Sequence, residues 1–245
     1  MADWHPNLAH YDELIQALDP NGPPEVRTVV GNPALGERLA VLPAAFNPPT
    51  RAHLGLALAA LDSGAFDRLL LMLSVRIIDK EATTGASLDS RLHMLTLVAS
   101  GQPHVGVALC NRGLYLDQAT AIQDALAPRD LAFVVGFDKI IQILDPRYYV
   151  NRDDALRSLF RQAHFLVAPR DGADEAMLDE LFGRPENREY RSRVAFLPLS
   201  AMQAKEQALS STLVRELLGR GKDAGWAVPP AIAGYLQRAN PYQER

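Results

Sequence analysis

The stretch LAVLPAAFNPPTRAHLGLALAAL, residues 39–61, decides the fold. Its first part is apolar, like a strand that is buried on both faces, and its last part has apolar residues at helical spacing. Between them lies a polar corner, Asn47-Pro48-Pro49-Thr50, which is followed by His53. We expect the strand to end near Phe46 and the helix to start near Arg51, because each proline keeps the preceding residue extended and offers no N–H. The free N–H groups and the positive dipole of such a helix start form a ready site for an anion.

Further apolar runs of this kind, rich in Val, Leu and Phe, alternate with segments of helical periodicity along the chain. This alternation predicts the α/β class, with a doubly wound, mostly parallel sheet of Rossmann-like type. In such sheets ligands bind beyond the carboxyl ends of the strands, near the point where the strand order reverses. Strands are predicted at 39–46, 68–75, 104–109, 130–136, 163–169 and 193–199, and helices at 52–63, 88–100, 117–127, 138–144, 153–162 and 174–183.

The two ends of the chain depart from the alternation. We expect residues 1–37 to form an N-terminal appendage packed on a core domain of residues 38–200, with residues 201–245 as a C-terminal helical part. The final helix starts at two prolines, which a first helical turn tolerates. In these end segments, helices are predicted at 7–18, 204–221 and 229–239, and a short extended piece at 25–30.

Composition limits the classes of protein to which the chain can belong. With 245 residues, 48% of them hydrophobic, it can bury the core of one large domain. A net charge of -4 gives no basic field for a nucleic acid polymer, so an anionic ligand needs a local cluster. With Cys110 as the single cysteine, the chain cannot form an internal disulfide or a Cys/His zinc framework, and we expect Cys110 to be buried. No apolar run approaches the roughly 20 residues of a membrane span, and the N-terminus is too polar for a secretory signal. We therefore expect a cytoplasmic protein without a membrane partner.

Four segments, taken in order, resemble the signatures of the nucleotidyltransferase superfamily. AAFNPPTRAHL (44–54) is similar to its turn of phenylalanine, asparagine and proline followed by His-or-Thr-x-x-His, and it is most similar to the nicotinamide/nicotinate mononucleotide adenylyltransferase branch. SVRIIDK with SRLHML (74–80, 90–95) resembles the lysine loop and the following helix of that branch. VVGFDKIIQILDPRYY (134–149) resembles its Gly-x-Asp strand end, and SSTLVREL (210–217) resembles its Ser-Ser-Thr-x-x-Arg helix start.

The resemblance implies a reaction in which a mononucleotide phosphate attacks the α-phosphorus of ATP in line, giving a dinucleotide and pyrophosphate. The partners implied are ATP and a pyridine mononucleotide, with Mg²⁺ held mainly by the ATP phosphates as the cofactor. A phosphate monoester has a second pKa near 6, so it is already ionised at neutral pH and needs no general base. Catalysis then depends on positioning and on donors or cations that stabilise charge. The sequence has neither a Gly-x-Ser-x-Gly elbow nor a Walker A loop.

The resemblance also assigns roles to residues. His53, and Thr50 where many relatives have His, would contact the ATP phosphates, and Arg215 would place its guanidinium fork on them. Lys80, in a loop, would reach the phosphates of either substrate. These four are the predicted catalytic residues. The full ATP site is expected to comprise Ala45, Phe46, Thr50, His53, Gly136, Asp138, Ser211, Thr212 and Arg215, and the mononucleotide site Asn47, Lys80, Tyr115, Tyr148 and Tyr149.

Each assignment has a structural alternative. Thr50 and Asp138 are common helix-capping residue types, and the three tyrosines would fit equally well in a core. Relatives often have glycine where this chain has Ala44, Ala45 and Ala52, which leaves less room for close approach of a nucleotide. Two further functions therefore stay open: transfer to another phosphorylated acceptor such as phosphopantetheine, or use of CTP, and nucleotide binding without turnover in a regulatory protein. The choice between nicotinamide and nicotinate also stays open, as does the oligomeric state, for which a homo-oligomer is one alternative.

Overall fold

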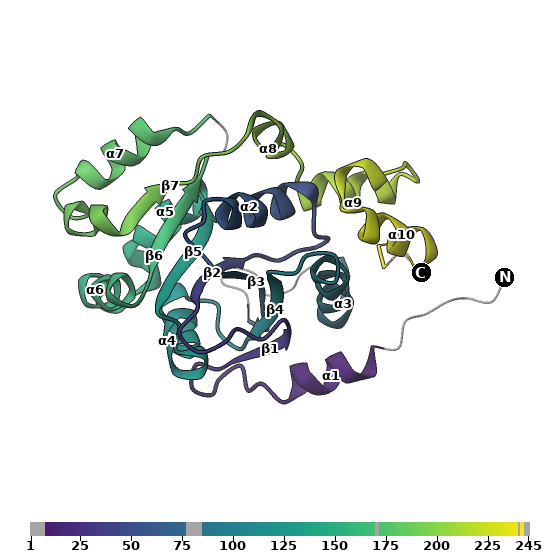
Figure 1. The fold of residues 1–245 in the computed structure, drawn as a ribbon, viewed down its shortest axis with the longest axis horizontal. Helices are drawn as coiled ribbons and strands as arrows, with labels where there is room; N and C mark the ends of the chain where they lie inside the picture. The colour runs from purple at the N-terminus through teal and green to yellow at the C-terminus, as the bar shows by residue number, and fades with distance from the viewer. Residues whose placement is uncertain (1–7, 77–84, 170–171, 240, 243–245) are drawn as a thin grey trace.

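The computed structural model describes residues 8–76, 85–169, 172–239 and 241–242. They form a seven-stranded sheet in the order β1-β4-β3-β2-β5-β6-β7, with helices on both faces (Figure 1). Neighbouring strands are parallel except for β1, which runs antiparallel to β4 at one edge. The predicted doubly wound, mostly parallel α/β fold is therefore confirmed. The strands are β1 (Val26–Val30), β2 (Arg38–Pro43), β3 (Arg68–Ser74), β4 (Val105–Cys110), β5 (Asp130–Gly136), β6 (His164–Ala168) and β7 (Val194–Phe196).

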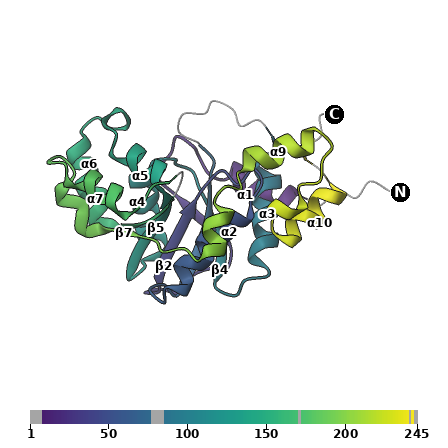
Figure 2. The ribbon, with the colours of Figure 1, turned by 90° about the horizontal axis from the view of Figure 1, so that it is seen from above.

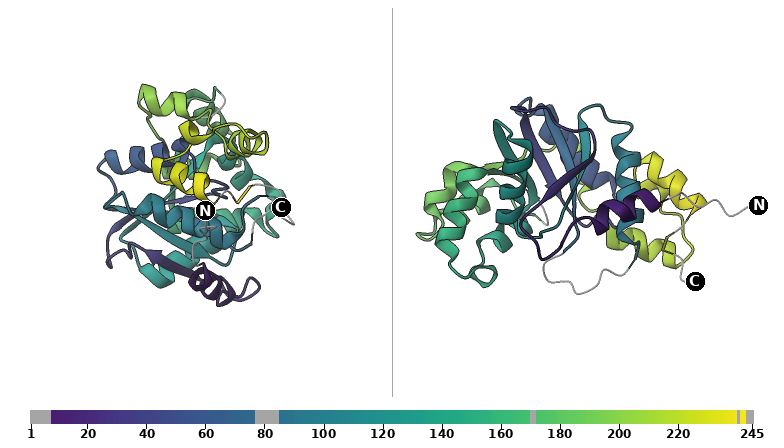
Figure 3. Two further views of the ribbon diagram at one scale, coloured as in Figure 1. Left: turned by 90° about the vertical axis from the view of Figure 1, so that its right-hand side faces the viewer. Right: turned by 90° about the horizontal axis from the view of Figure 1, so that it is seen from below.

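The sheet separates two apolar cores, as its uniformly apolar strands predict. Along β2, Leu39 and Val41 join one core while Ala40 and Leu42 join the other. Figures 2 and 3 show α3 and α10 on one side of the sheet and α4 and α6 on the other. The helices are α1 (Ala9–Gln16), α2 (Arg51–Asp62), α3 (Leu88–Ala99), α4 (Tyr115–Leu126), α5 (Phe137–Leu144), α6 (Arg152–Gln162), α7 (Glu175–Gly183), α8 (Ala201–Glu206), α9 (Ser211–Gly219) and α10 (Pro230–Arg238), with 3₁₀ turns η1 (Pro146–Tyr148), η2 (Arg188–Arg193) and η3 (Gly225–Ala227).

The N-terminal segment is tied to the rest of the chain through α1 and β1, among other contacts. Tyr11 on α1 is buried, and its hydroxyl lies 2.8 Å from the hydroxyl of Thr96 on α3. The extended piece predicted at 25–30 is β1, which adds a strand to the sheet beside β4. Cys110, the last residue of β4, is buried as predicted. The division of the chain at residues 37 and 200 stays a prediction. No helix in the described ranges is long and apolar enough to cross a membrane.

Three predicted extents were wrong, and one of them is β7, which ends at Phe196 rather than at residue 199. Strand β2 ends at Pro43 rather than near Phe46, since the backbone of Phe46 is left-handed, with a φ of 45°, and the chain turns there. The helix predicted over 204–221 is two helices, α8 and α9. They are separated because Ser210 is extended and caps α9, with its hydroxyl accepting the N–H of Leu213 at 3.1 Å.

The strand order places a crevice next to β2. The chain runs from β2 to β3 and β4 on one side, and then returns to place β5 on the other side of β2. The connections that leave the carboxyl ends of β2 and β5 therefore diverge, one into α2 and the other into α5. Such a reversal point is where open α/β sheets bind their ligands.

A substitution at Gly106 on β4 can test how closely β4 and β1 approach each other. A Cβ atom at Gly106 would lie 2.7 Å from the backbone oxygens of Val30 and Gly31. We predict that Gly106→Ala lowers the free energy of unfolding by about 1–3 kcal/mol, because backbone atoms must shift to make room. Urea denaturation measures this, with Gly183→Ala in open space as the matched control. Equal losses in both variants would contradict the close contact.

Candidate active site

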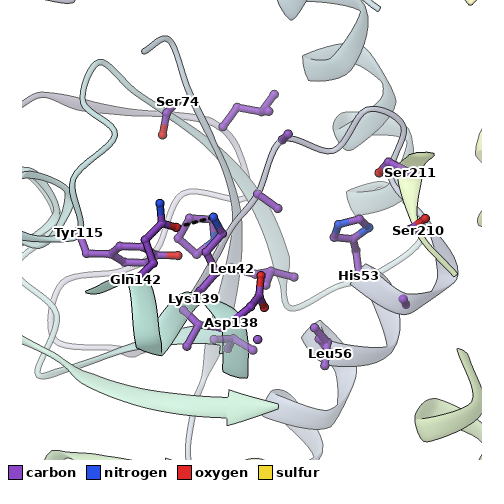
Figure 4. Close-up of a pocket in the computed structure, with 18 of the residues that line it drawn as sticks. Leu42, His53, Leu56, Ser74, Tyr115, Asp138, Lys139, Gln142, Ser210 and Ser211 are labelled. Carbon is purple, nitrogen blue, oxygen red and sulfur yellow. Dashed lines mark hydrogen bonds between the residues drawn. The ribbon is translucent and has the colours of Figure 1, made fainter. Parts of the chain in front are cut away.

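A cavity of about 410 Å³ opens at the crevice between the carboxyl ends of β2 and β5 (Figure 4). Helices α2, α5 and α9 all begin at this cavity, with residues of their first turns in its lining. The first N–H groups of a helix have no partner within the helix, and its dipole is positive at that end. The cavity therefore collects donors and partial positive charge, which suit a polyanionic ligand.

His53 lines the cavity from the first turn of α2 (Figure 4). Its Nδ1 accepts the backbone N–H of Thr50 at 3.1 Å and lies 2.8 Å from the Thr50 hydroxyl. A backbone N–H can only donate, so Nδ1 is the acceptor and the neutral ring carries its proton on Nε2. Phe46 packs beside the imidazole, with ring centroids 5.0 Å apart. These contacts hold the ring in one place with a donor on Nε2.

The polar corner is bound to the start of α9, far along the chain. Arg215 donates from Nη1 to the carbonyl of Asn47 at 2.6 Å, and the hydroxyl of Ser211 donates to the carbonyl of Pro48 at 2.7 Å. The Thr50 hydroxyl also donates to the carbonyl of Leu209 at 3.3 Å. These bonds keep the start of α9 beside the start of α2, so both helix ends form one wall of the cavity.

The opposite wall carries the aromatic ring of Tyr115 and two polar side chains that are hydrogen-bonded to each other. Tyr115, the first residue of α4, is half-buried and packs edge-on against Phe133, with centroids 5.2 Å apart. Burial raises the pKa of its hydroxyl well above the usual range, so the phenol stays neutral. Lys139 on α5 donates from Nζ to Oε1 of Gln142 at 2.7 Å (Figure 4). The aromatic face of Tyr115 makes this wall suited to a flat ring.

The described residues hold no group of three or more His, Cys, Asp or Glu side chains that could bind a metal ion. Within the described lining of the cavity, Asp138 is the one carboxylate, and it is exposed on the first turn of α5. A divalent ion in this cavity would thus take most of its oxygen ligands from a bound substrate.

The structure brings only part of the predicted site into the cavity. The predicted residues in the lining are Ala45, His53, Tyr115, Gly136, Asp138, Ser211 and Thr212. Phe46, Asn47 and Thr50 are buried behind the wall, and Arg215 is bound to the Asn47 carbonyl outside the described lining. Lys80 lies outside the described residues.

Tyr148 and Tyr149 also lie outside the described lining, on the turn that follows α5. The Tyr148 hydroxyl accepts a hydrogen bond from Nε2 of Gln142 at 2.9 Å, so Tyr148 reaches the cavity only through that side chain. Tyr149 donates its hydroxyl to the carbonyl of Ile143 at 2.8 Å, and burial raises its pKa to about 12. Neither ring is placed against the cavity as Tyr115 is.

Several polar lining residues were not predicted from the sequence: Ser74, Arg76, Gln118, Lys139 and Gln142. Ser74 and Arg76 end or follow β3, and Lys139 lies in the first turn after β5, so the rule that sites follow strand ends could have found them. Gln118 and Gln142 gave no such signal, because a polar residue within a helix usually marks a solvated face.

The fold and the cavity define a nucleotide-binding α/β protein, and sequence comparison identifies its family. The cytidylyltransferase-like family model matches residues 41–217, and the chain belongs to this family. The prediction of a nucleotidyltransferase of the nicotinamide/nicotinate mononucleotide adenylyltransferase-like branch is confirmed.

Individual relatives agree with this assignment. A Schizosaccharomyces pombe protein named as a nicotinamide mononucleotide adenylyltransferase is 35% identical over 54% of this chain and 53% of its own length. A Gloeobacter violaceus protein named as a nicotinate-nucleotide adenylyltransferase is 28% identical over 85% of this chain and 97% of its own. A structure of Plasmodium falciparum nicotinic acid mononucleotide adenylyltransferase has the same fold, with a TM-score of 0.58, 15% identity, and coverage of 84% of this chain and 97% of that chain.

Thr50 offers a test of how His53 is positioned. We predict that Thr50→Val lowers kcat/KM for nucleotidyl transfer about three- to tenfold, because it removes the hydroxyl beside Nδ1 and the bond to the carbonyl of Leu209. Thr50→Ser keeps that hydroxyl and should retain the activity. Pyrophosphate release measures both variants, and thermal unfolding checks that they are folded. A Val variant as active as the Ser variant would contradict the positioning role.

Proposed function

We propose that this protein is an adenylyltransferase that joins ATP to nicotinamide or nicotinate mononucleotide, giving the dinucleotide and pyrophosphate. One observation carries the proposal: a single cavity has the starts of α2 and α9 with His53 at one wall and the neutral ring of Tyr115 at the other. The first wall suits a triphosphate and the second suits a pyridine ring. The names of the relatives support the same reaction.

In this reaction an oxygen of the mononucleotide phosphate forms a bond to the α-phosphorus of ATP. The bond from that phosphorus to the bridging oxygen of the β-phosphate breaks, and pyrophosphate leaves with the electron pair. The attacking phosphate is already ionised, so this chain needs donors rather than a base. His53 donates from Nε2 toward the charge that develops at phosphorus, and the N–H groups at the starts of α2 and α9 stabilise the leaving pyrophosphate.

The remaining predicted residues are assigned either to ATP with its metal ion or to the mononucleotide. Arg215 lies one turn into α9, and its guanidinium also donates to the hydroxyl of Thr212 in the first turn at 3.1 Å. We assign Arg215 to the pyrophosphate. Asp138 is available to the metal ion or the ATP ribose. Mg²⁺ bound to the phosphates would neutralise their charge. Lys80, with Asn47, Tyr148 and Tyr149, stays a predicted contact of the mononucleotide or its phosphate.

Pyrophosphate release from ATP and Mg²⁺ tests the proposed reaction. The purified protein is assayed with nicotinamide mononucleotide, nicotinate mononucleotide, phosphopantetheine or no acceptor. We expect release only with a pyridine mononucleotide, together with formation of the dinucleotide. Release with phosphopantetheine alone would reassign the acceptor, and ATP binding without acceptor-dependent release would indicate a regulatory protein.

His53→Ala tests the role of the imidazole in that reaction. We predict a fall in kcat of about 10²-fold, which is typical of removing one donor that stabilises the transition state. His104→Ala, at an exposed position outside the cavity lining, is the matched control and should leave kcat unchanged. Equal activity of the two variants would remove His53 from the mechanism.

A further inference from the structure

We propose that Arg91 is a positioning residue of the active site, which holds the left-handed turn at Phe46 and thereby the imidazole of His53. The inference rests on the proposed function, because it assigns a role in the same reaction. Arg91 lies on α3, and its side chain is outside the described lining of the cavity. It therefore acts through other residues rather than by contact with a substrate.

The backbone turn at Phe46 needs support from its surroundings. The φ of this residue is 45°, in a left-handed region that a bulky side chain rarely adopts. Such a conformation persists where surrounding contacts hold it, and it is found most often at functional sites. The buried ring of Phe46 packs beside the imidazole of His53, with centroids 5.0 Å apart. A change in this turn would therefore move a direct neighbour of the imidazole.

Two arginines bind backbone carbonyls on either side of Phe46. Arg91 donates from Nη1 to the carbonyl of Ala45 at 3.1 Å. Arg215 donates from Nη1 to the carbonyl of Asn47 at 2.6 Å. The residues that supply these carbonyls directly precede and follow Phe46, so the two bonds fix the chain on both sides of the left-handed residue. One arginine comes from α3 and the other from α9.

Arg91 is itself held in place at the start of α3. The residue is 4% exposed, and its Nε donates to the carbonyl of Ser87, one turn earlier, at 3.4 Å. The N–H of Ala86, just before the helix, donates to Oδ1 of Asn47 at 3.1 Å, which ties the helix start to the same turn. A buried guanidinium is costly unless its donors are bonded, so the side chain is restricted to these acceptors.

The charge of Arg91 strengthens its hold on the turn. Burial lowers the pKa of Arg91, whereas the phenol of Tyr242 and the carboxylate of Asp89 act in the opposite direction. The guanidinium stays charged, because arginine is not deprotonated in proteins. A charged donor forms a stronger hydrogen bond than a neutral one. The bond to the carbonyl of Ala45 is therefore a firm constraint on the turn.

A double-mutant cycle with His53 tests the positioning role by pyrophosphate release at saturating substrates. We expect Arg91→Met, which removes the donors, to lower kcat about tenfold, because a displaced imidazole stabilises the transition state less well. In the His53→Ala background the same substitution should lower kcat less than about threefold, since its effect passes through the imidazole. Arg91→Lys, which keeps the charge without the fork, should show a smaller effect of the same kind.

Arg152→Met is the matched control. Arg152 also donates to backbone carbonyls, those of Leu144 at 2.8 Å and Glu186 at 3.1 Å, and it lies outside the described lining. This variant should leave kcat unchanged. Thermal unfolding checks that each variant is folded.

The NMR signals of the His53 imidazole provide a readout that needs no turnover. They are assigned by their loss in His53→Ala, and their chemical shifts depend on the aromatic ring of Phe46 beside them. We expect these signals to move in Arg91→Met, to move less in Arg91→Lys and to keep their positions in Arg152→Met.

Unmoved imidazole signals in a folded Arg91→Met protein would overturn the inference. An equal fall in kcat in the wild-type and His53→Ala backgrounds would overturn it as well, because a purely structural loss acts in both. If Arg91→Met does not fold, wild-type kcat and wild-type signals in Arg91→Lys would have the same meaning. A wild-type protein that releases no pyrophosphate with any acceptor would instead contradict the proposed function, and the NMR measurement would still decide the inference.

Discussion

The site depends on the hydrogen bonds between the polar corner, residues 47–50, and the segment 209–215. The prolines of the corner have no N–H, and the chain has left the sheet at Pro43, so the carbonyls of this turn have no strand partner. Arg215 and Ser211 bind the carbonyls of Asn47 and Pro48 instead. Hydrogen bonds between residues more than 150 positions apart in the sequence thereby hold one wall of the cavity together.

This connection explains how an acidic protein can hold a triphosphate. The net charge is -4, so the overall field does not attract an anion. The corner and α9 instead bring helix starts, His53 and the hydroxyls of Ser211 and Thr212 to one place. Local donors in a confined cavity stabilise charge more than the same groups do in water. The opposite wall presents the aromatic ring of Tyr115 instead of a helix start with His53.

The sequence predicts the strands, the sheet class and the importance of the corner, because apolar runs and prolines act through local sterics and burial. It also places Gly136 and Asp138 at a strand end, and both line the cavity. It cannot show that Arg215 reaches the Asn47 carbonyl or that Thr50 is buried behind His53, since both depend on contacts between distant segments. For the same reason β1 was predicted only as a short extended piece rather than as an antiparallel edge strand.

The central claim is that the triphosphate lies between the starts of α2 and α9. The most direct measurement is a crystal structure of the protein with Mg²⁺ and an ATP analogue that cannot be cleaved. The account predicts phosphate oxygens within hydrogen-bond distance of Nε2 of His53 and of the N-terminal N–H groups of α9. Phosphates found instead against Tyr115 and Gln118, or outside the cavity, would contradict it.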